Sequence, residues 1–202
     1  MKTTYSSALS VLLLAGSVIM FSPARAASAQ TGEPGSVPEM QAPKAAAAKP
    51  LASPAATADV RVDGKAITIH YNSPRMRGRK IMGGLVPYGK EWRTGANPAT
   101  SFVTEGDVKI GDLNVPAGKY TLYTLPAAPG TPWMLIINKQ TGQWGTVYNQ
   151  GQDLGRTAMR SRELPAAQED MSLSFEHTTN DSTELHVKWE KTDEWVKIEA
   201  AH

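Results

Sequence analysis

The segment DVRVDGKAITIHY, residues 59–71, decides the fold class of this chain. Apolar and polar residues alternate on both sides of Asp63 and Gly64, a pair that favours the two-residue turn of a β-hairpin. The alternation puts Ile67 and Ile69 on one face of a strand and His70 on the opposite face. We therefore expect a hairpin of two strands with one buried face, formed by residues 59–62 and 66–71.

Short runs of β-branched and aromatic residues recur along the rest of the chain, while no window keeps an apolar stripe of helical period for three turns. The run WMLII, residues 133–137, is apolar throughout, which favours a strand covered on both faces. One short helix is expected at residues 153–162. The further strands are expected at residues 101–105, 107–110, 118–125, 133–138, 146–148, 171–177, 183–190 and 194–199.

The last two of these runs flank Lys191-Thr192-Asp193, so we expect them to form a second hairpin. About ten short strands without long helices favour an all-β fold, with two antiparallel sheets packed as a β-sandwich. A partly closed barrel is the alternative.

The first 29 residues have the pattern of a bacterial secretory signal peptide. Lys2 precedes an apolar run at residues 9–21, and small-residue cleavage sites follow it, after Ala26 or after Ala29. The apolar run is too short to span a bilayer comfortably, so no stable membrane insertion is expected after cleavage. Residues 30–57 are rich in Ala and Pro and hold no aromatic residue, so a disordered linker is expected there. Residues 58–200 then form a single β domain, periplasmic or secreted.

The charge balance and the cysteine content exclude some classes of partner and of covalent link. The chain has 21 Lys and Arg against 19 Asp and Glu, and removal of the signal peptide with Lys2 and Arg25 balances the two. A neutral exported domain gives no reason to expect a nucleic acid partner. The chain has no cysteine, so disulfides and an N-terminal lipid anchor on cysteine are excluded.

Arginine is concentrated in the stretch SPRMRGRKIMGGLVPYGKEWRTGANPAT, residues 73–100, which holds six Lys or Arg and a single acid, Glu91. The stretch is too polar for a core and too rich in Gly and Pro for a long helix, so structured loops are expected. Guanidinium groups bind carboxylates and phosphates through paired hydrogen bonds, and a tryptophan face can stack on a sugar. We expect these loops to meet residues 138–144 and form a site. The expected ligand-binding residues are Arg75, Arg77, Arg79, Trp92, Arg93, Thr94, Asn97, Asn138, Lys139 and Trp144.

The alternative is that these arginines are structural. In that case Arg75 and Arg93 pair with acids of the same domain and hold the loops in place. The acids nearest in sequence are Glu91, Glu105, Asp107 and Asp112.

No catalytic signature accompanies the loops. A nucleophile is not evident, because the chain has no Cys and no Gly-x-Ser-x-Gly. The four histidines, His70, His177, His186 and His202, lack the spacing of zinc motifs, although His177 and His186 can face each other across a turn near Asn180. No metal and no cofactor are expected.

The sequence favours a binding protein without an assigned reaction, whose partner is an anionic small molecule or a glycan. One alternative is a hydrolase of cell-envelope glycan or peptide that uses His70 or a carboxylate such as Asp153. Another is a protein-interaction domain displayed on the flexible linker, which requires an exposed apolar patch.

Three segments resemble the shared blocks of a bacterial family known as domain of unknown function 2911. They are residues 73–100, NVPAGKYTLYTLP at residues 114–126, and INKQTGQWGTVYNQGQDLGR at residues 137–156. The resemblance covers about residues 59–198, and its motifs WRTGAN and NKxxGxWG are specific, since strand propensity alone does not produce them. The resemblance implies an exported β-rich domain and implies no activity.

Overall fold

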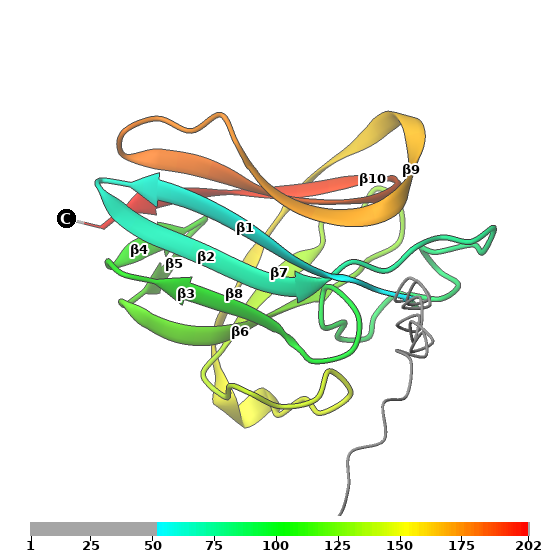
Figure 1. Ribbon diagram of the computed structural model, residues 1–202, viewed down its shortest axis with the longest axis horizontal. Helices are drawn as coiled ribbons and strands as arrows, with labels where there is room; N and C mark the ends of the chain where they lie inside the picture. Colours follow the sequence, from blue (N-terminus) through cyan, green and yellow to red (C-terminus); the bar gives the residue numbers. More distant parts are fainter. Residues whose placement is uncertain (1–51, 202) are drawn as a thin grey trace, which may run out of the picture. The chain divides into compact units, whose positions relative to one another are not determined.

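The expected hairpin is present in the computed structural model, which describes residues 52–201 (Figure 1). β1 (Ala55–Val62) and β2 (Lys65–Asn72) pair antiparallel. The turn residues Asp63 and Gly64 both have positive φ, 49° and 70°, which the favoured hairpin turn requires. β1 begins inside the stretch expected to be linker. The expected signal peptide, residues 1–29, and most of the expected linker lie outside the described residues.

The described residues contain ten strands in two antiparallel sheets, which confirms the expected sandwich rather than a partly closed barrel. The larger sheet has the order β1-β2-β3-β6-β7-β8, and the smaller has the order β5-β4-β10-β9. In Figure 1, β9 and β10 lie above β1 and β2. The remaining strands are β3 (Thr100–Thr104), β4 (Val108–Ile110), β5 (Leu113–Val115), β6 (Gly118–Leu125), β7 (Met134–Asn138), β8 (Asp153–Ala158), β9 (Arg160–Glu176) and β10 (Ser182–Ala200).

The second expected hairpin is present as a reversal of the chain inside a single assigned strand, β10, of 19 residues. The two ends of β10 lie together, because Ala200 N donates to Asp181 O at 2.9 Å, and Nδ1 of His186 lies 2.7 Å from Oδ1 of Asp193. The register between β10 and β9 shifts on both sides of Glu190, which has a φ of 55°. This is a β-bulge, and pairing resumes beyond it at Thr192 and Glu163. The expected turn residues therefore lie where β10 reverses, and both halves of the strand pair with β9.

The expected helix at residues 153–162 was wrong. These residues form β8 and the start of β9, because the edge of β7 pairs with them, as Leu135 does with Thr157. Tertiary pairing decides the conformation here over local preference. The strand expected at residues 146–148 is part of a loop, and β5 was not expected.

The apolar core lies between the sheets. Ile69, Phe102 and Tyr120 stand in register across β2, β3 and β6, and all three are buried. Trp92 joins this core from the arginine-rich loop and stacks on Trp189 of β10, with ring centroids 5.9 Å apart and planes at 19°. The loop is therefore fixed to the sandwich by one of its aromatic residues.

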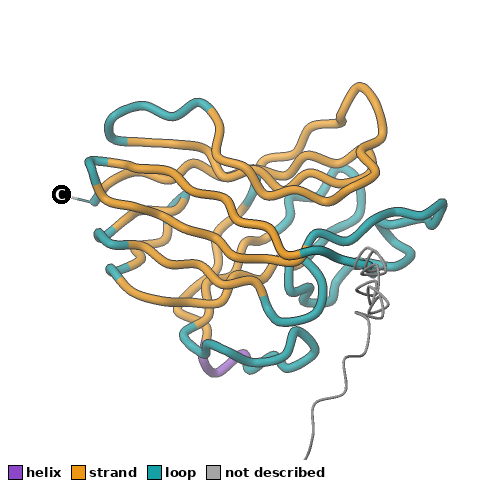
Figure 2. Tube along the Cα trace, viewed as in Figure 1, coloured by secondary structure: helices purple, strands orange, loops and turns teal. Residues whose placement is uncertain are grey.

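The larger sheet is covered on its outer face as well. Tyr123 of β6 and Ile136 of β7 are buried there, although they point away from the main core. Their cover is the loop of residues 139–152, which ends in the short helical turn η1 (Gln150–Gln152; Figure 2). No helix in residues 52–201 is long and apolar enough to cross a membrane.

Candidate functional site

Two of the three loops expected to form a site meet on this outer face. Gly145 N donates to Asn97 O at 3.2 Å, and Ala99 N donates to Gln143 O, also at 3.2 Å. Pro98 and Trp144 form a bridge between the same two segments. The motifs WRTGAN and NKxxGxWG, 40 or more residues apart in the chain, are thus neighbours in space.

Arg93 reaches the outer face because Trp92 points the other way. The backbone of Trp92 pairs with Thr124 of β6, with N to O distances of 2.8 and 2.9 Å. Successive side chains of an extended segment alternate between its faces, so Trp92 enters the core while Arg93 lies beside Tyr123. Packing of one residue therefore orients its neighbour.

The guanidinium of Arg93 is half-buried, and its Nε has no hydrogen-bond partner in the described protein. Within residues 52–201, no carboxylate lies at ion-pair distance from it. Burial lowers the pKa of Arg93, and the neighbouring Tyr123 acts in the opposite direction. The side chain lies directly beneath Gly145, where a Cβ would come within 1.8 Å of Arg93 Cδ.

A second unpartnered polar atom lies in the same site. Gln143 Nε2 donates to the hydroxyl of Tyr123 at 2.9 Å, but its Oε1 is buried without a partner. Tyr123 in turn donates to Val147 O at 2.8 Å, and burial raises the pKa of this tyrosine. Of three buried, unpartnered side-chain polar atoms among the described residues, two therefore surround Tyr123.

A paired arginine lies on the same outer face and differs from Arg93. Arg156 of β8 binds Asp153 through Nε and one terminal nitrogen, at 3.1 and 3.0 Å, and lies 3.6 Å from Glu91. Tyr148 donates to the same Asp153 at 2.7 Å, and burial followed by this bond raises the pKa of Tyr148 well above its usual range. Asp153 was the carboxylate of the hydrolase alternative, and both its oxygens are occupied: Oδ2 accepts from Arg156 and Tyr148, and Oδ1 accepts from Nδ2 of Asn138 at 2.8 Å.

The arginines of the first loop lie elsewhere. Arg75 pairs with Asp170 of β9 through two hydrogen bonds of 2.5 and 3.2 Å, so its partner is none of the four acids expected from the sequence. Arg77 and Arg79 are exposed, and their guanidinium groups donate to backbone oxygens. This loop therefore docks on β9 and does not join the other two.

The remaining expected ligand residues divide by exposure. Trp92, Thr94 and Asn138 are buried, and Thr94 and Asn138 use their side chains in hydrogen bonds that fix the loops. Asn97 and Lys139 are exposed. Trp144 is 56% exposed, the highest fraction among the exposed large hydrophobic residues.

A groove of about 410 Å³ runs beside this site along the larger sheet. It is lined by side chains of β2, β3 and β6, including His70 and Ser101, and by Pro98 and Gln143 of the two meeting loops. Gln143 therefore connects the groove with the buried surroundings of Tyr123.

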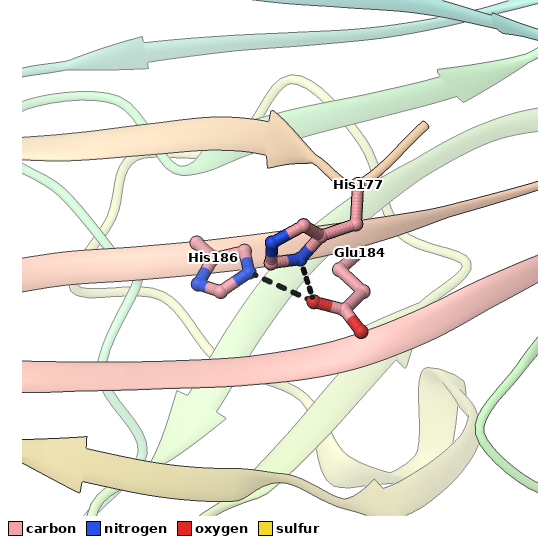
Figure 3. A group of neighbouring side chains, drawn as sticks. All are labelled: His177, Glu184 and His186. Atoms are coloured by element: carbon pink, nitrogen blue, oxygen red, sulfur yellow. Dashed lines mark hydrogen bonds and ion pairs between the residues drawn. The ribbon is translucent and has the colours of Figure 1, made fainter. Parts of the chain in front are cut away.

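A second cluster of functional side chains lies at the turn between β9 and β10 (Figure 3). Nδ1 of His177 and Nε2 of His186 both approach Oε2 of Glu184, at 2.7 and 3.3 Å. The sequence indicated that the two histidines can face each other, and their ring centroids lie 6.3 Å apart. Neither Glu184 nor the nearby Asp193 was singled out, although Glu-x-His on a strand places both side chains on one face.

The matching family model is described as "Protein of unknown function (DUF2911)" and covers residues 53–198. Searches of the curated proteins and of the solved structures each return no match. The matched region includes all ten strands except the last two residues of β10, and it contains both meeting loops. The chain therefore belongs to the DUF2911 family.

Proposed function

We propose that this domain binds a small anionic ligand, bearing a carboxylate or a phosphate, at Arg93. One observation carries the proposal: Arg93 is a half-buried cation without a carboxylate partner, whereas Arg156, on the same outer face, has two. The same outer face thus holds one neutralised and one free guanidinium.

Burial of a charge without a partner is costly, and buried polar atoms in proteins are nearly always hydrogen-bonded. Arg93 Nε and Gln143 Oε1 break this rule together, one as a donor and one as an acceptor. Neither atom is reached by solvent, so a ligand that carries an anionic oxygen and a hydroxyl satisfies both atoms once the loop at Gly145 moves off Arg93. Sugar acids and sugar phosphates have this combination of groups.

The exposed groups around the site suit such a ligand. Trp144 offers an aromatic face to solvent, and Asn97 and Lys139 are exposed on the loops beside it. A tryptophan face packs well against the apolar side of a sugar ring. In this proposal the arginines of the first loop take no part, since Arg75 pairs with Asp170 of β9 and the guanidinium groups of Arg77 and Arg79 donate to backbone oxygens. The secretory signal pattern supports an encounter with the ligand outside the cytoplasm.

Calorimetric titration with D-glucuronate and with inorganic phosphate tests this proposal. We expect the wild-type protein to bind at least one of these anions and the Arg93→Gln variant to bind it roughly 10- to 100-fold more weakly, the usual effect of losing a hydrogen bond to a charged group. The matched control is Arg79→Gln, which removes an arginine of the first loop and should leave the affinity unchanged.

Each of three outcomes would overturn the proposal. The first is that the wild-type protein binds neither anion, which leaves water as the partner of Arg93. The second is that Arg93→Gln binds as tightly as the wild type, and the third is that Arg79→Gln loses as much affinity as Arg93→Gln. Circular dichroism of each variant shows whether a loss of binding reflects a loss of fold.

A further inference from the structure

We propose that His177, Glu184 and His186 bind a divalent transition metal ion of the zinc type. The site lies at the turn between β9 and β10 and uses none of the residues around Arg93. Its ligand atoms are Nδ1 of His177, Oε2 of Glu184 and Nε2 of His186, and they all lie within 4.8 Å of one another.

The distances suit a small tetrahedral ion. With bonds of about 2.0–2.1 Å to nitrogen and oxygen, two ligand atoms of a tetrahedral zinc site lie roughly 3.3 Å apart. Nε2 of His186 lies 3.3 Å from Oε2 of Glu184, and Nδ1 of His177 lies 2.7 Å from it. Figure 3 shows both imidazole rings directed at the same carboxylate oxygen. The distance between Nδ1 of His177 and Oε2 of Glu184 must lengthen from 2.7 Å towards roughly 3.3 Å to admit the ion.

The sheet fixes two of these ligands. Glu184 and His186 are two residues apart on β10, so both side chains lie on the same face of that strand. Glu184 pairs with Glu176, the last residue of β9, and His177 follows directly. His177 has a φ of 48°, in the left-handed region that few side-chain-bearing residues adopt. This conformation lets a residue beyond the strand turn its ring back towards the cluster.

Asp193 holds His186 as metal-binding histidines are usually held. Its side chain is fully buried, and Oδ1 accepts a hydrogen bond from Nδ1 of His186 at 2.7 Å. Trp195 stacks on the same imidazole at 5.9 Å. A carboxylate on one ring nitrogen fixes the tautomer, so that the other nitrogen presents its lone pair to a metal.

This tautomer makes the cluster incomplete without a cation. The lone pair of His186 Nε2 then faces the carboxylate oxygen of Glu184, and Glu176 Oε2 is 3.8 Å away. Two acceptors at 3.3 Å repel each other unless a proton or a metal ion lies between them. His186 is almost fully buried, with 1% of its side chain exposed, so water does not separate them from outside.

The surrounding charges favour a cation. Three carboxylates, those of Glu176, Glu184 and Asp193, lie around the rings, and two basic residues balance them in part. Lys188 pairs with Glu176, and Arg162 pairs with Asp193 at 2.7 Å. One negative charge is left over, that of Glu184, the residue between the two rings.

The ligand types indicate which kind of metal ion fits the site, and the neighbouring space shows where a further ligand can reach it. Two imidazoles and one carboxylate suit zinc, and the absence of cysteine from the chain disfavours ions that require thiolates. Three protein ligands leave a fourth position for water or a ligand atom. A cavity of about 430 Å³ adjoins the site, with Glu184, Trp195 and Arg160 in its lining.

Metal binding by the full chain tests this inference. The probe is Zn²⁺ alone, followed by calorimetry, with Co²⁺ absorption as a second readout of tetrahedral coordination. We expect one ion per chain, with affinity at least about tenfold lower in His177→Asn and Glu184→Gln, and roughly 10- to 100-fold lower in Asp193→Asn. The control is His70→Asn, an exposed histidine outside the cluster, which should bind as the wild type does.

His177→Asn keeps the test valid if the buried variants fail to fold. His177 is exposed, and asparagine adopts a positive φ readily. The inference is overturned if the wild-type chain binds no stoichiometric zinc, which leaves a proton between His186 and Glu184, or if folded His177→Asn and His70→Asn bind equally, which makes the binding adventitious. Either result leaves the proposal for Arg93 untouched.

Discussion

Trp92 stacks on Trp189 with ring centroids 5.9 Å apart, and this contact joins the arginine-rich loop to the smaller sheet. The edge of Trp133 meets Trp92 at 6.5 Å, so three tryptophans share one part of the core. Because Trp92 and Arg93 are adjacent, the stack also sets the position of the guanidinium on the opposite face. The site of the proposed function therefore depends on core packing.

Trp92→Ala should lower the free energy of unfolding by about 3–5 kcal/mol, because it removes a buried indole and leaves a cavity. Urea denaturation of the purified variant measures this change. The matched control is Trp144→Ala, since Trp144 is 56% exposed, and we expect it to stay within about 0.5 kcal/mol of the wild type. Equal losses in the two variants would show that Trp92 is not a core anchor.

Gly145→Ala should destabilise the protein by about 1–3 kcal/mol and displace Arg93. A Cβ at this position would lie 1.8 Å from Arg93 Cδ and 2.6 Å from the backbone oxygen of Asn97, so side chain and backbone must both move. The affinity for the anion should fall as well, because Arg93 is displaced. At Gly151 the nearest atom to a new Cβ is 3.3 Å away, so Gly151→Ala is the control, and a Gly145→Ala protein as stable as this control contradicts the packing described here.

The stability of the domain should fall as the pH rises towards 8 because of Glu194. This residue is 2% exposed, its Oε2 has no partner, and burial raises its pKa to about 7. A carboxyl whose pKa is higher in the folded state stabilises the fold below its unfolded pKa of about 4.3 and loses that contribution as the pH passes the folded value.

Glu194→Gln removes this dependence. We expect the variant to gain stability relative to the wild type between about pH 5 and pH 8, by up to about 3 kcal/mol. Urea denaturation at a series of pH values measures the difference. Glu163→Gln, at a side chain that is 71% exposed, is the control. Parallel profiles for Glu194→Gln and the wild type would mean that Glu194 is ionised in the folded protein throughout this range.

Alternation along the strands made much of the fold predictable. The Asp63-Gly64 turn fixed the first hairpin, and the run at residues 133–137 is buried on both faces because the loop of residues 139–152 covers the outer one. Prediction failed where a neighbouring strand decides the conformation. Residues 153–162, expected to be helical, form β8 and the start of β9 because β7 pairs with the first of them, which local composition does not reveal.

The candidate sites were predictable in residue type and less so in arrangement. Arg93, Asn97 and Trp144 gather because two distant loops share backbone hydrogen bonds, whereas Arg75 turns to Asp170, 95 residues away. Sequence spacing carries no information on such contacts. The position of Tyr123 on the outer face could have been predicted, because it alternates along β6 with residues that face the core.

The central claim is that the guanidinium of Arg93 lacks a protein partner and takes one from an anionic ligand. NMR of the Nε–Hε group of Arg93, assigned by its loss in Arg93→Lys, tests this most directly. Titration with D-glucuronate or phosphate should shift this signal to a saturable limit and slow its exchange with water. A signal that neither anion moves would contradict the account.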